Sequence, residues 1–335
     1  MRKKGLVEKM VMKPPAEENF SPDQFPKNRG KLFLYMLKNK FPKIYKNHLL
    51  ISLFFLPLIA WGVLTIGYTD WFFKLEAAEG INHFGEYWFT VYVTAIPLWA
   101  IAFVGVSGGL NVIRKLAWSD PVILKTDFLQ GIKSGGKQIA LIGFLWGTVH
   151  ALVRYAYEWL GLYHRAIDGS PSVTFGIFIC IFVMLALAGL TVYMTCMSSL
   201  YNVTLGQLLA GAFKLYFSDF FLASGVMILC ILPIIILMHT GYIITLLIAY
   251  FLLLALLIGV VIIPMFLVCQ HTFDRVINKK DYPIYYGRGL SYGDYSVQNV
   301  TLDDERQEDL EEKDMDIDNK NQIENDFERV NDECN

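Results

Sequence analysis

The chain has 335 residues, of which 54% are hydrophobic and 18% are charged. A soluble domain usually carries about a quarter charged residues, and the apolar residues here fall in blocks too long for a soluble core, so the composition excludes an ordinary soluble protein. The formal net charge of −2 is unevenly divided, because the segment from Asp303 to Glu333 holds 15 acidic and 4 basic residues. The remainder is basic, as is typical beside an anionic membrane surface, and it does not indicate a nucleic-acid partner.

The first 48 residues are polar and basic, without the early apolar stretch of a cleavable signal peptide. Residues 1–30 are expected to form a flexible basic segment. The stretch from Lys31 to Lys46 is expected to form an amphipathic helix on the membrane surface, broken at Pro42.

Six later windows are apolar over about the 20 residues that a helix needs to cross a bilayer. Continuously apolar runs favour helices over barrel strands, because a helix satisfies its own backbone hydrogen bonds in hydrocarbon. The sequence therefore predicts an all-α, polytopic membrane helix bundle over residues 31–275, with about six transmembrane helices. The windows are Leu49–Gly67, Trp88–Val106, Ile139–Leu162, Val173–Met197, Phe220–Met238 and Ile243–Val268.

Basic residues between the windows predict the orientation, because Lys and Arg gather on the cytoplasmic side. The first 48 residues carry 12 of them, and the loop after the second window carries five more. The stretch from Tyr68 to Tyr87 has only Lys74 against four acidic residues. Both termini are therefore expected in the cytoplasm. The weak point is the loop from Ser198 to Asp219, whose only basic residue is Lys214.

The two inner loops are expected to carry short interfacial helices, because apolar residues recur there every four positions. These residues are Leu124, Phe128 and Ile132 in one loop, and Leu205, Leu209 and Phe213 in the other. Residues 276–335 are expected to form a cytoplasmic tail that is acidic and disordered from about residue 296.

Two glycine-rich strings imitate enzyme motifs. Residues Gly131 to Lys137 fit a phosphate-binding loop, but Gln138 stands where Ser or Thr should hold magnesium. Residues Gly105 to Gly109 fit GxSxG, but a membrane helix precedes them where a strand is needed. We interpret the first as a break leading into the third membrane helix and the second as a flexible helix end. Five cysteines without a CxxC pair indicate no metal site. The sequence therefore predicts no enzyme, no catalytic residues, no cofactor and no metal.

The third window carries a polar stripe. His150, Arg154 and Glu158 stand four residues apart and so share one helix face. Ionisable groups inside a membrane span are costly, so the stripe is a candidate ligand or ion pathway. The alternative is structural, because Arg154 and Glu158 lie in the outer half of the helix and can reach the surface.

Small residues run beside that stripe at Gly143, Gly147 and Ala151. This spacing allows two helices to approach closely. It predicts that the stripe lies near a helix interface.

A distinctive pattern of residues runs through the two inner loops. It consists of Gly109-Leu-Asn-Val-Ile-Arg-Lys115, Asp127-Phe-Leu-Gln-Gly-Ile-Lys133, Lys137-Gln138, and Tyr201-Asn-Val-Thr-Leu-Gly-Gln-Leu-Leu-Ala-Gly-Ala-Phe213. This pattern resembles the YesL family, a group of bacterial membrane proteins built around a domain of unknown function. The likeness covers roughly residues 30 to 275, and the extended N-terminus and acidic tail depart from the compact family pattern.

The resemblance implies a non-enzymatic accessory or assembly subunit beside a carbohydrate ABC transporter in the bacterial plasma membrane. Its partners would be the lipid bilayer and either transporter subunits or a second copy of the chain. The alternative is an autonomous small-solute transporter that uses the polar stripe.

Overall fold

The computed structural model describes residues 25–79, 84–166, 170–238 and 258–291, with four isolated positions between 239 and 257. Every regular element in these ranges is helical, which confirms the all-α prediction for the described part of the chain. The long helices are α2 (Arg29–Glu79), α3 (Phe84–Trp118), α4 (Leu124–Ala166), α5 (Pro171–Leu200), α6 (Leu205–Ser218), α7 (Phe220–Met238) and α9 (Ile258–Phe273). A π-helical turn (Asp274–Asn278), α10 (Lys279–Asp281) and a 3-10 turn (Pro283–Tyr285) follow.

Four helices, α2 to α5, are long and apolar enough to cross a membrane, and α6 with α7 forms a pair bent by 88° that can count as a fifth span. The chain is therefore a membrane helix bundle. The predicted number of six spans is not confirmed. The sixth window, Ile243–Val268, lies largely outside the described residues, and its described helix begins at Ile258.

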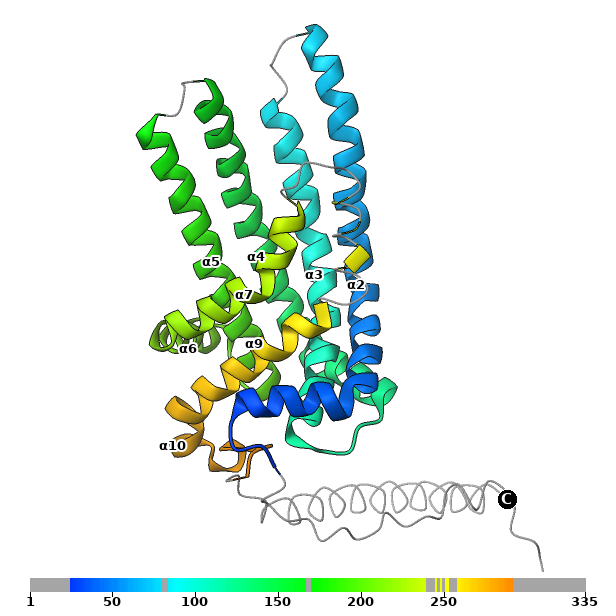
Figure 1. The fold of residues 1–335 in the computed structure, drawn as a ribbon, viewed down its shortest axis with the longest axis vertical. Coiled ribbons are helices and arrows are strands. Elements are labelled where there is room, and N and C mark those ends of the chain that lie inside the picture. The colour runs from blue at the N-terminus through cyan, green and yellow to red at the C-terminus, as the bar shows by residue number, and fades with distance from the viewer. Residues whose placement is uncertain are drawn as a thin grey trace, which may run out of the picture.

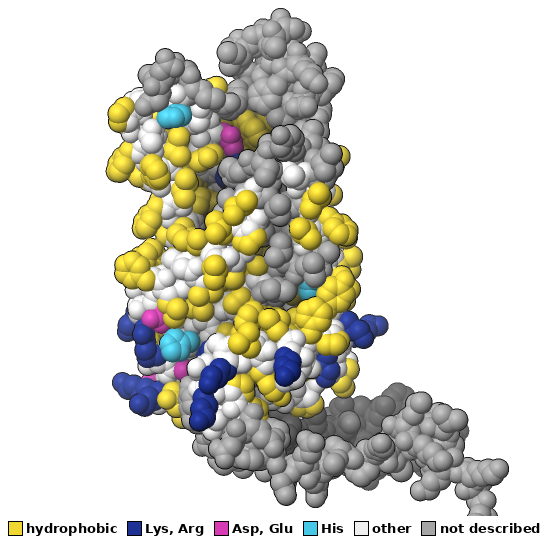
Figure 2. All heavy atoms as spheres, in the orientation of Figure 1, with side chains coloured by type: hydrophobic (Ala, Val, Ile, Leu, Met, Phe, Trp, Pro, Cys, Tyr) yellow, Lys and Arg dark blue, Asp and Glu magenta, His cyan; other side chains and the backbone are white. Residues whose placement is uncertain are grey.

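The spanning helices stand side by side, and α9 runs obliquely across them towards one end of the bundle (Figure 1). We call this end of the bundle the foot. The helices α2 and α4 begin at the foot, and α3 and α5 end there. Lys and Arg side chains gather at the foot on the face shown in Figure 2, whereas yellow apolar side chains cover the bundle above them. The main cluster of buried apolar residues lies in the half of the bundle next to the foot and includes Leu32, Ile113, Tyr216 and Phe273.

The beginning of α2 lies across the foot before the helix turns up into the bundle (Figure 1). Leu32 and Met36 are fully buried, whereas Leu34 and Phe41 are exposed, as expected of a helix on the membrane surface. The expected break at Pro42 does not interrupt the helix, because α2 is continuous from Arg29 to Glu79.

The expected glycine-rich break before the third span is absent, and the first inner loop has no separate short helix. Instead α4 runs unbroken from Leu124 to Ala166. Gly131 faces α3 so closely that a Cβ there would lie 2.9 Å from the Ser107 carbonyl oxygen. The hydroxyl of Ser107 donates a hydrogen bond to the Gly131 carbonyl at 2.8 Å. Glycine is therefore used at this position for close packing inside a helix.

The second inner loop carries its predicted short helix, α6. Its start is stabilised by Gln207, whose side chain accepts a hydrogen bond from the Thr204 backbone N–H at 3.0 Å in a capping box. Leu208 and Ala212 are fully buried against the bundle, whereas Phe213 is 57% exposed. The helix thus packs on one side and presents apolar side chains on another.

The bend between α6 and α7 is held by Asp219. Its carboxylate accepts hydrogen bonds from Arg275 at 2.6 Å and from the Thr272 hydroxyl at 2.7 Å. The Thr272 hydroxyl also lies 2.8 Å from that of Tyr193 on α5. These contacts tie the turn to α9 and α5, so the direction of α6 is fixed relative to the bundle.

Candidate functional site

The structure brings Arg154 and Glu158 of the predicted stripe together. Arg154 Nη2 lies 2.7 Å from Glu158 Oε1. The Tyr92 hydroxyl, from α3, donates to the same oxygen at 3.0 Å. The Arg154 guanidinium also lies 5.0 Å from the ring centroid of Tyr157 and 5.9 Å from that of Tyr92. Aromatic faces of this kind stabilise a cation.

His150 lies one turn nearer the foot, among aromatic rings. Its ring centroid is 5.4 Å from Trp99, 5.7 Å from Trp146 and 6.3 Å from Tyr92. Trp146 lies four residues before His150 on α4, so it continues the spacing of the stripe, whereas Tyr92 and Trp99 come from α3. The seven-residue spacing of Tyr92 and Trp99 puts them on one face of α3, but only the pairing of α3 with α4 shows that they meet His150.

The small residues beside the stripe face α3. A Cβ on Gly143 would lie 2.6 Å from the Phe103 Cβ, and one on Gly147 would lie 3.1 Å from the Ile96 backbone. Ala151 is buried in a small cluster with Tyr92. The structure therefore places the stripe along the α3–α4 interface.

The GxSxG string also lies in this interface and next to α2. A Cβ on Gly105 would lie 2.5 Å from the Phe54 Cβ, and one on Gly108 would lie 2.8 Å from the Phe128 carbonyl oxygen. The glycines therefore let α2 and α4 pack closely on two sides of α3. This close packing accounts for the string without a nucleophile.

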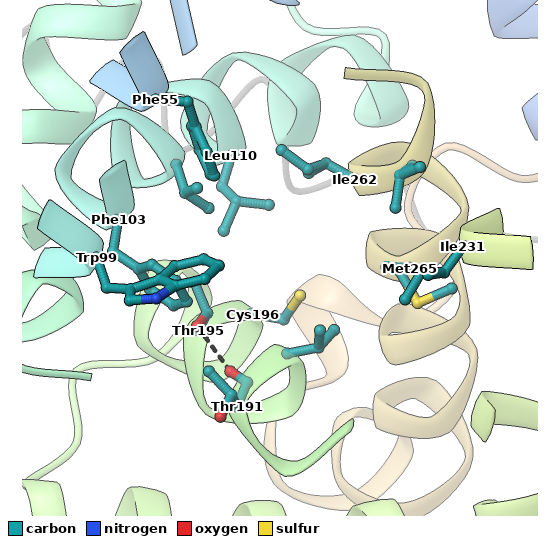
Figure 3. A pocket seen from close by; sticks show the side chains of 13 residues that line it. Phe55, Trp99, Phe103, Leu110, Thr191, Thr195, Cys196, Ile231, Ile262 and Met265 are labelled. Atoms are coloured by element: carbon teal, nitrogen blue, oxygen red, sulfur yellow. Dashed lines mark hydrogen bonds between the residues drawn. The ribbon is translucent and has the colours of Figure 1, made fainter. Parts of the chain in front are cut away.

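An apolar cavity of about 350 Å³ lies between α2, α3, α5, α7 and α9 (Figure 3). Small-molecule sites usually occupy about 300–1,000 Å³, so this cavity is at the small end of that range. Trp99 lies in its wall and also contacts His150, so one indole ring joins the cavity to the polar stripe. The lining residues are Phe55, Trp99, Phe103, Val106, Leu110, Thr191, Val192, Thr195, Cys196, Ile231, Val261, Ile262 and Met265.

The hydroxyl groups of the two threonines in that wall already donate hydrogen bonds within α5, so neither is free to donate one to a ligand. Each hydroxyl donates to the carbonyl one turn earlier in α5: Thr195 to Thr191 at 2.7 Å, and Thr191 to Leu187 at 2.8 Å. The cavity therefore suits an apolar group better than a sugar.

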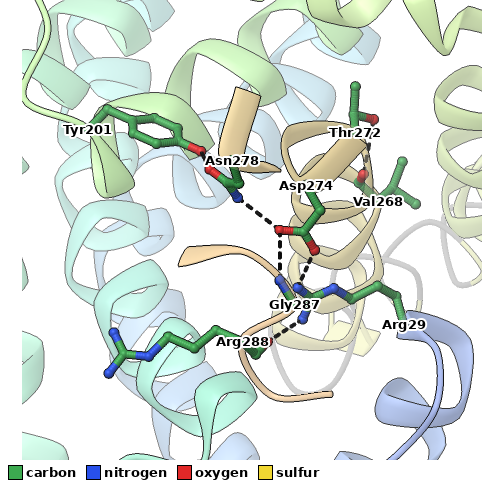
Figure 4. Close-up of polar contacts among 8 residues, drawn as sticks. All are labelled: Arg29, Tyr201, Val268, Thr272, Asp274, Asn278, Gly287 and Arg288. Atoms are coloured by element: carbon green, nitrogen blue, oxygen red, sulfur yellow. Dashed lines mark hydrogen bonds and ion pairs between the residues drawn. The ribbon is translucent and has the colours of Figure 1, made fainter. Parts of the chain in front are cut away.

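At the foot, the N- and C-terminal parts of the described chain are joined around Asp274 (Figure 4). Arg29 Nη2 lies 2.6 Å from Asp274 Oδ2, and both side chains are only 8% exposed. Arg29 also donates to the Arg288 carbonyl at 2.7 Å, and the Ser291 N–H donates to the Pro26 carbonyl at 3.2 Å. We call residues 25–29 together with 274–291 the clasp.

The clasp reaches the end of α5 through a buried chain of hydrogen bonds. The Asn278 amide donates to Asp274 Oδ1 at 2.8 Å, and the Tyr201 hydroxyl donates to the Asn278 oxygen at 2.6 Å. The Tyr201 hydroxyl is protonated at physiological pH even at the usual tyrosine pKa of about 10, and burial raises its pKa further. No local sequence pattern predicts this network, because Arg29 and Asp274 are 245 residues apart.

Among the residues that the structure describes, no three His, Cys, Asp or Glu side chains are grouped as they would need to be to hold a metal ion. The sequence of this chain matches no protein-family model and no curated protein, and its structure matches no solved structure.

Proposed function

We propose that the chain is a non-enzymatic accessory subunit that docks on another membrane protein in the bacterial plasma membrane, with both termini in the cytoplasm. The proposed partner is a carbohydrate ABC transporter, and this part of the proposal comes from the YesL resemblance. The orientation is supported by the Lys and Arg side chains at the foot (Figure 2).

The exposed aromatic side of α6 and the first turn of α7 is the observation that carries the proposal. Phe213, Phe217 and Phe221 are 57%, 48% and 89% exposed. The rings of Phe213 and Phe217 are 4.5 Å apart, and Phe217 stacks on Phe220 at 5.8 Å. Large aromatic side chains are enriched in the cores of protein interfaces.

The opposite side of α6 packs against the helix bundle, so the exposed aromatic surface is rigid. Leu208 and Ala212 are fully buried, and Asp219 fixes the bend to α7 through Arg275 and Thr272. A surface that is already ordered loses less conformational entropy on binding, which favours affinity. Packing against another membrane protein is therefore a suitable role for this face.

The test is photo-crosslinking in native membranes from position 213. A photoreactive residue at Phe213 is expected to form adducts with a subunit of a carbohydrate ABC transporter that also co-purifies in mild detergent. The matched control is Phe178 on α5, which is 64% exposed and should form adducts mainly with lipid. Lipid adducts alone from both positions, with a chain that purifies without a partner, would contradict the proposal.

A second candidate function, small-solute transport, is favoured by one specific observation. Trp99 joins the apolar cavity to His150, and the Arg154–Glu158 pair lies one to two turns further along α4. Ionisable groups next to a cavity inside a membrane bundle are typical of solute and ion pathways.

A further inference from the structure

The exposed charge of the foot is almost entirely positive. In the described part of the foot, eleven lysines are exposed, against one exposed acidic residue, Asp281. The lysines are Lys27, Lys31, Lys38, Lys43, Lys46, Lys125, Lys133, Lys137, Lys214, Lys279 and Lys280.

The other four described carboxylates of the foot do not offset these lysines, because each is paired with a Lys or Arg side chain. Asp127 pairs with Lys115 at 2.8 Å, Asp219 with Arg275 at 2.6 Å, Asp274 with Arg29 at 2.6 Å, and Asp120 with Arg288 at 3.8 Å. A surface with this excess of positive charge attracts an anionic partner.

The clasp delivers the C-terminal part of the chain to this surface. The Ser291 N–H bonds to the Pro26 carbonyl, so the chain continues from the foot itself. Gly289 seats the clasp against the end of α3, because its φ of +84° favours glycine and a Cβ would collide with the Ala117 carbonyl oxygen. Asp303 follows Ser291 by twelve residues, which reach up to ~40 Å when extended.

The sequence that begins there has the charge needed to cover the lysines. Residues 303–333 hold 15 acidic and 4 basic side chains and no apolar run that could cross a membrane. A segment of this composition is expected on the aqueous side of the foot, and the short connection would give it an effective concentration of roughly millimolar.

We propose that the acidic tail, residues 303–333, binds the exposed lysines of the foot in its own chain. This contact shields the foot from other anions, including acidic lipid headgroups. It is held by charges that water can reach, so it weakens as salt rises. The proposal is independent of the accessory role, because it requires no second protein.

The test uses the full chain in nanodiscs of neutral lipid, with a fluorescent synthetic peptide of residues 296–335 as the probe. In one full-length variant the 15 acidic residues of 303–333 are changed to Asn or Gln. We expect this variant to bind the peptide, and the wild-type chain to bind it roughly a hundredfold more weakly, because the tethered tail already occupies the foot. Raising the salt to about 0.5 M should release the peptide.

The matched control adds Lys38→Gln, Lys279→Gln and Lys280→Gln to the neutral-tail variant, because these exposed lysines lie outside the ion pairs of the foot. This addition should weaken peptide binding at least tenfold. Equal peptide binding by the wild-type and neutral-tail chains would overturn the proposal, as would no binding by either. Displacement of the peptide only by vesicles containing acidic lipid, with no difference between the two chains, would assign the foot to the lipid surface.

Discussion

Gly131 of α4 lies directly against Gly108 of α3, so that a Cβ on Gly131 would stand 3.0 Å from the Gly108 Cα. The same Cβ would lie 2.9 Å from the Ser107 carbonyl oxygen, and the Ser107 hydroxyl bonds to the Gly131 carbonyl at 2.8 Å. Two membrane helices therefore touch backbone to backbone, an arrangement that only very small side chains permit.

The first prediction concerns this crossing. Gly131→Ala should destabilise the protein by about 1–3 kcal/mol, because the methyl group meets backbone atoms that cannot move alone. The control is Gly161→Ala in the same helix, where a Cβ would meet nothing within 4 Å. Thermal unfolding in detergent measures both variants. Equal melting temperatures would show that α3 and α4 do not cross at Gly131.

The crossing also shows what a single sequence can and cannot predict. The first four spans were visible because a stretch of about 20 apolar residues is a local signal. The role of Gly131 cannot be predicted from the sequence, because glycine normally weakens a helix by about 0.5–1 kcal/mol relative to alanine and therefore indicates a break. Only the neighbouring helix shows why glycine is needed there.

Among the polar contacts, too, some are predictable from the sequence and others are not. The Arg154–Glu158 contact follows from a four-residue spacing on one helix, which a sequence displays. The Arg29–Asp274 pair has no such spacing, and its two residues meet only because α9 crosses the bundle to the foot (Figure 1). The aromatic surroundings of His150 likewise depend on which face of α3 meets α4.

The second prediction concerns the clasp. Arg29→Ala should destabilise the protein by about 3–5 kcal/mol, because it leaves the buried Asp274 carboxylate without its cation. Lys38→Ala is the control, because Lys38 is exposed and lies outside the ion pairs of the foot, so its removal should change the stability by no more than about 0.5 kcal/mol. Chemical or thermal unfolding of both variants gives the comparison. Equal losses of stability for the two variants would contradict the structural role of the clasp.

The third prediction concerns the orientation. Single cysteines replace Glu86, at the end of the bundle away from the foot, and Lys279, at the foot, in a chain without its native cysteines. Both positions are exposed, so neither substitution disturbs the core. A membrane-impermeant maleimide should label position 86 in intact cells and position 279 only after permeabilisation. The reverse pattern would place the foot and both termini outside.

The last prediction separates the two roles of the polar stripe. The His150 ring lies within 6.3 Å of three aromatic rings, so a phenyl ring can occupy the same space without a proton to exchange. We expect His150→Phe to keep the wild-type melting temperature. His150→Ala should lower the stability by about 3 kcal/mol, because it leaves a void among those rings.

The same variants are then reconstituted in vesicles and tested for uptake of labelled mono- and disaccharides and of labelled small apolar solutes, which suit the cavity better. The accessory role predicts that the wild-type chain alone moves none of them and that His150 matters only for packing. Uptake by the wild-type chain that is lost in His150→Phe, at unchanged stability, would favour transport, because that substitution keeps an aromatic ring at this position and removes the imidazole nitrogens. The Arg154–Glu158 pair and the cavity beyond Trp99 would then mark the two ends of the pathway to map next.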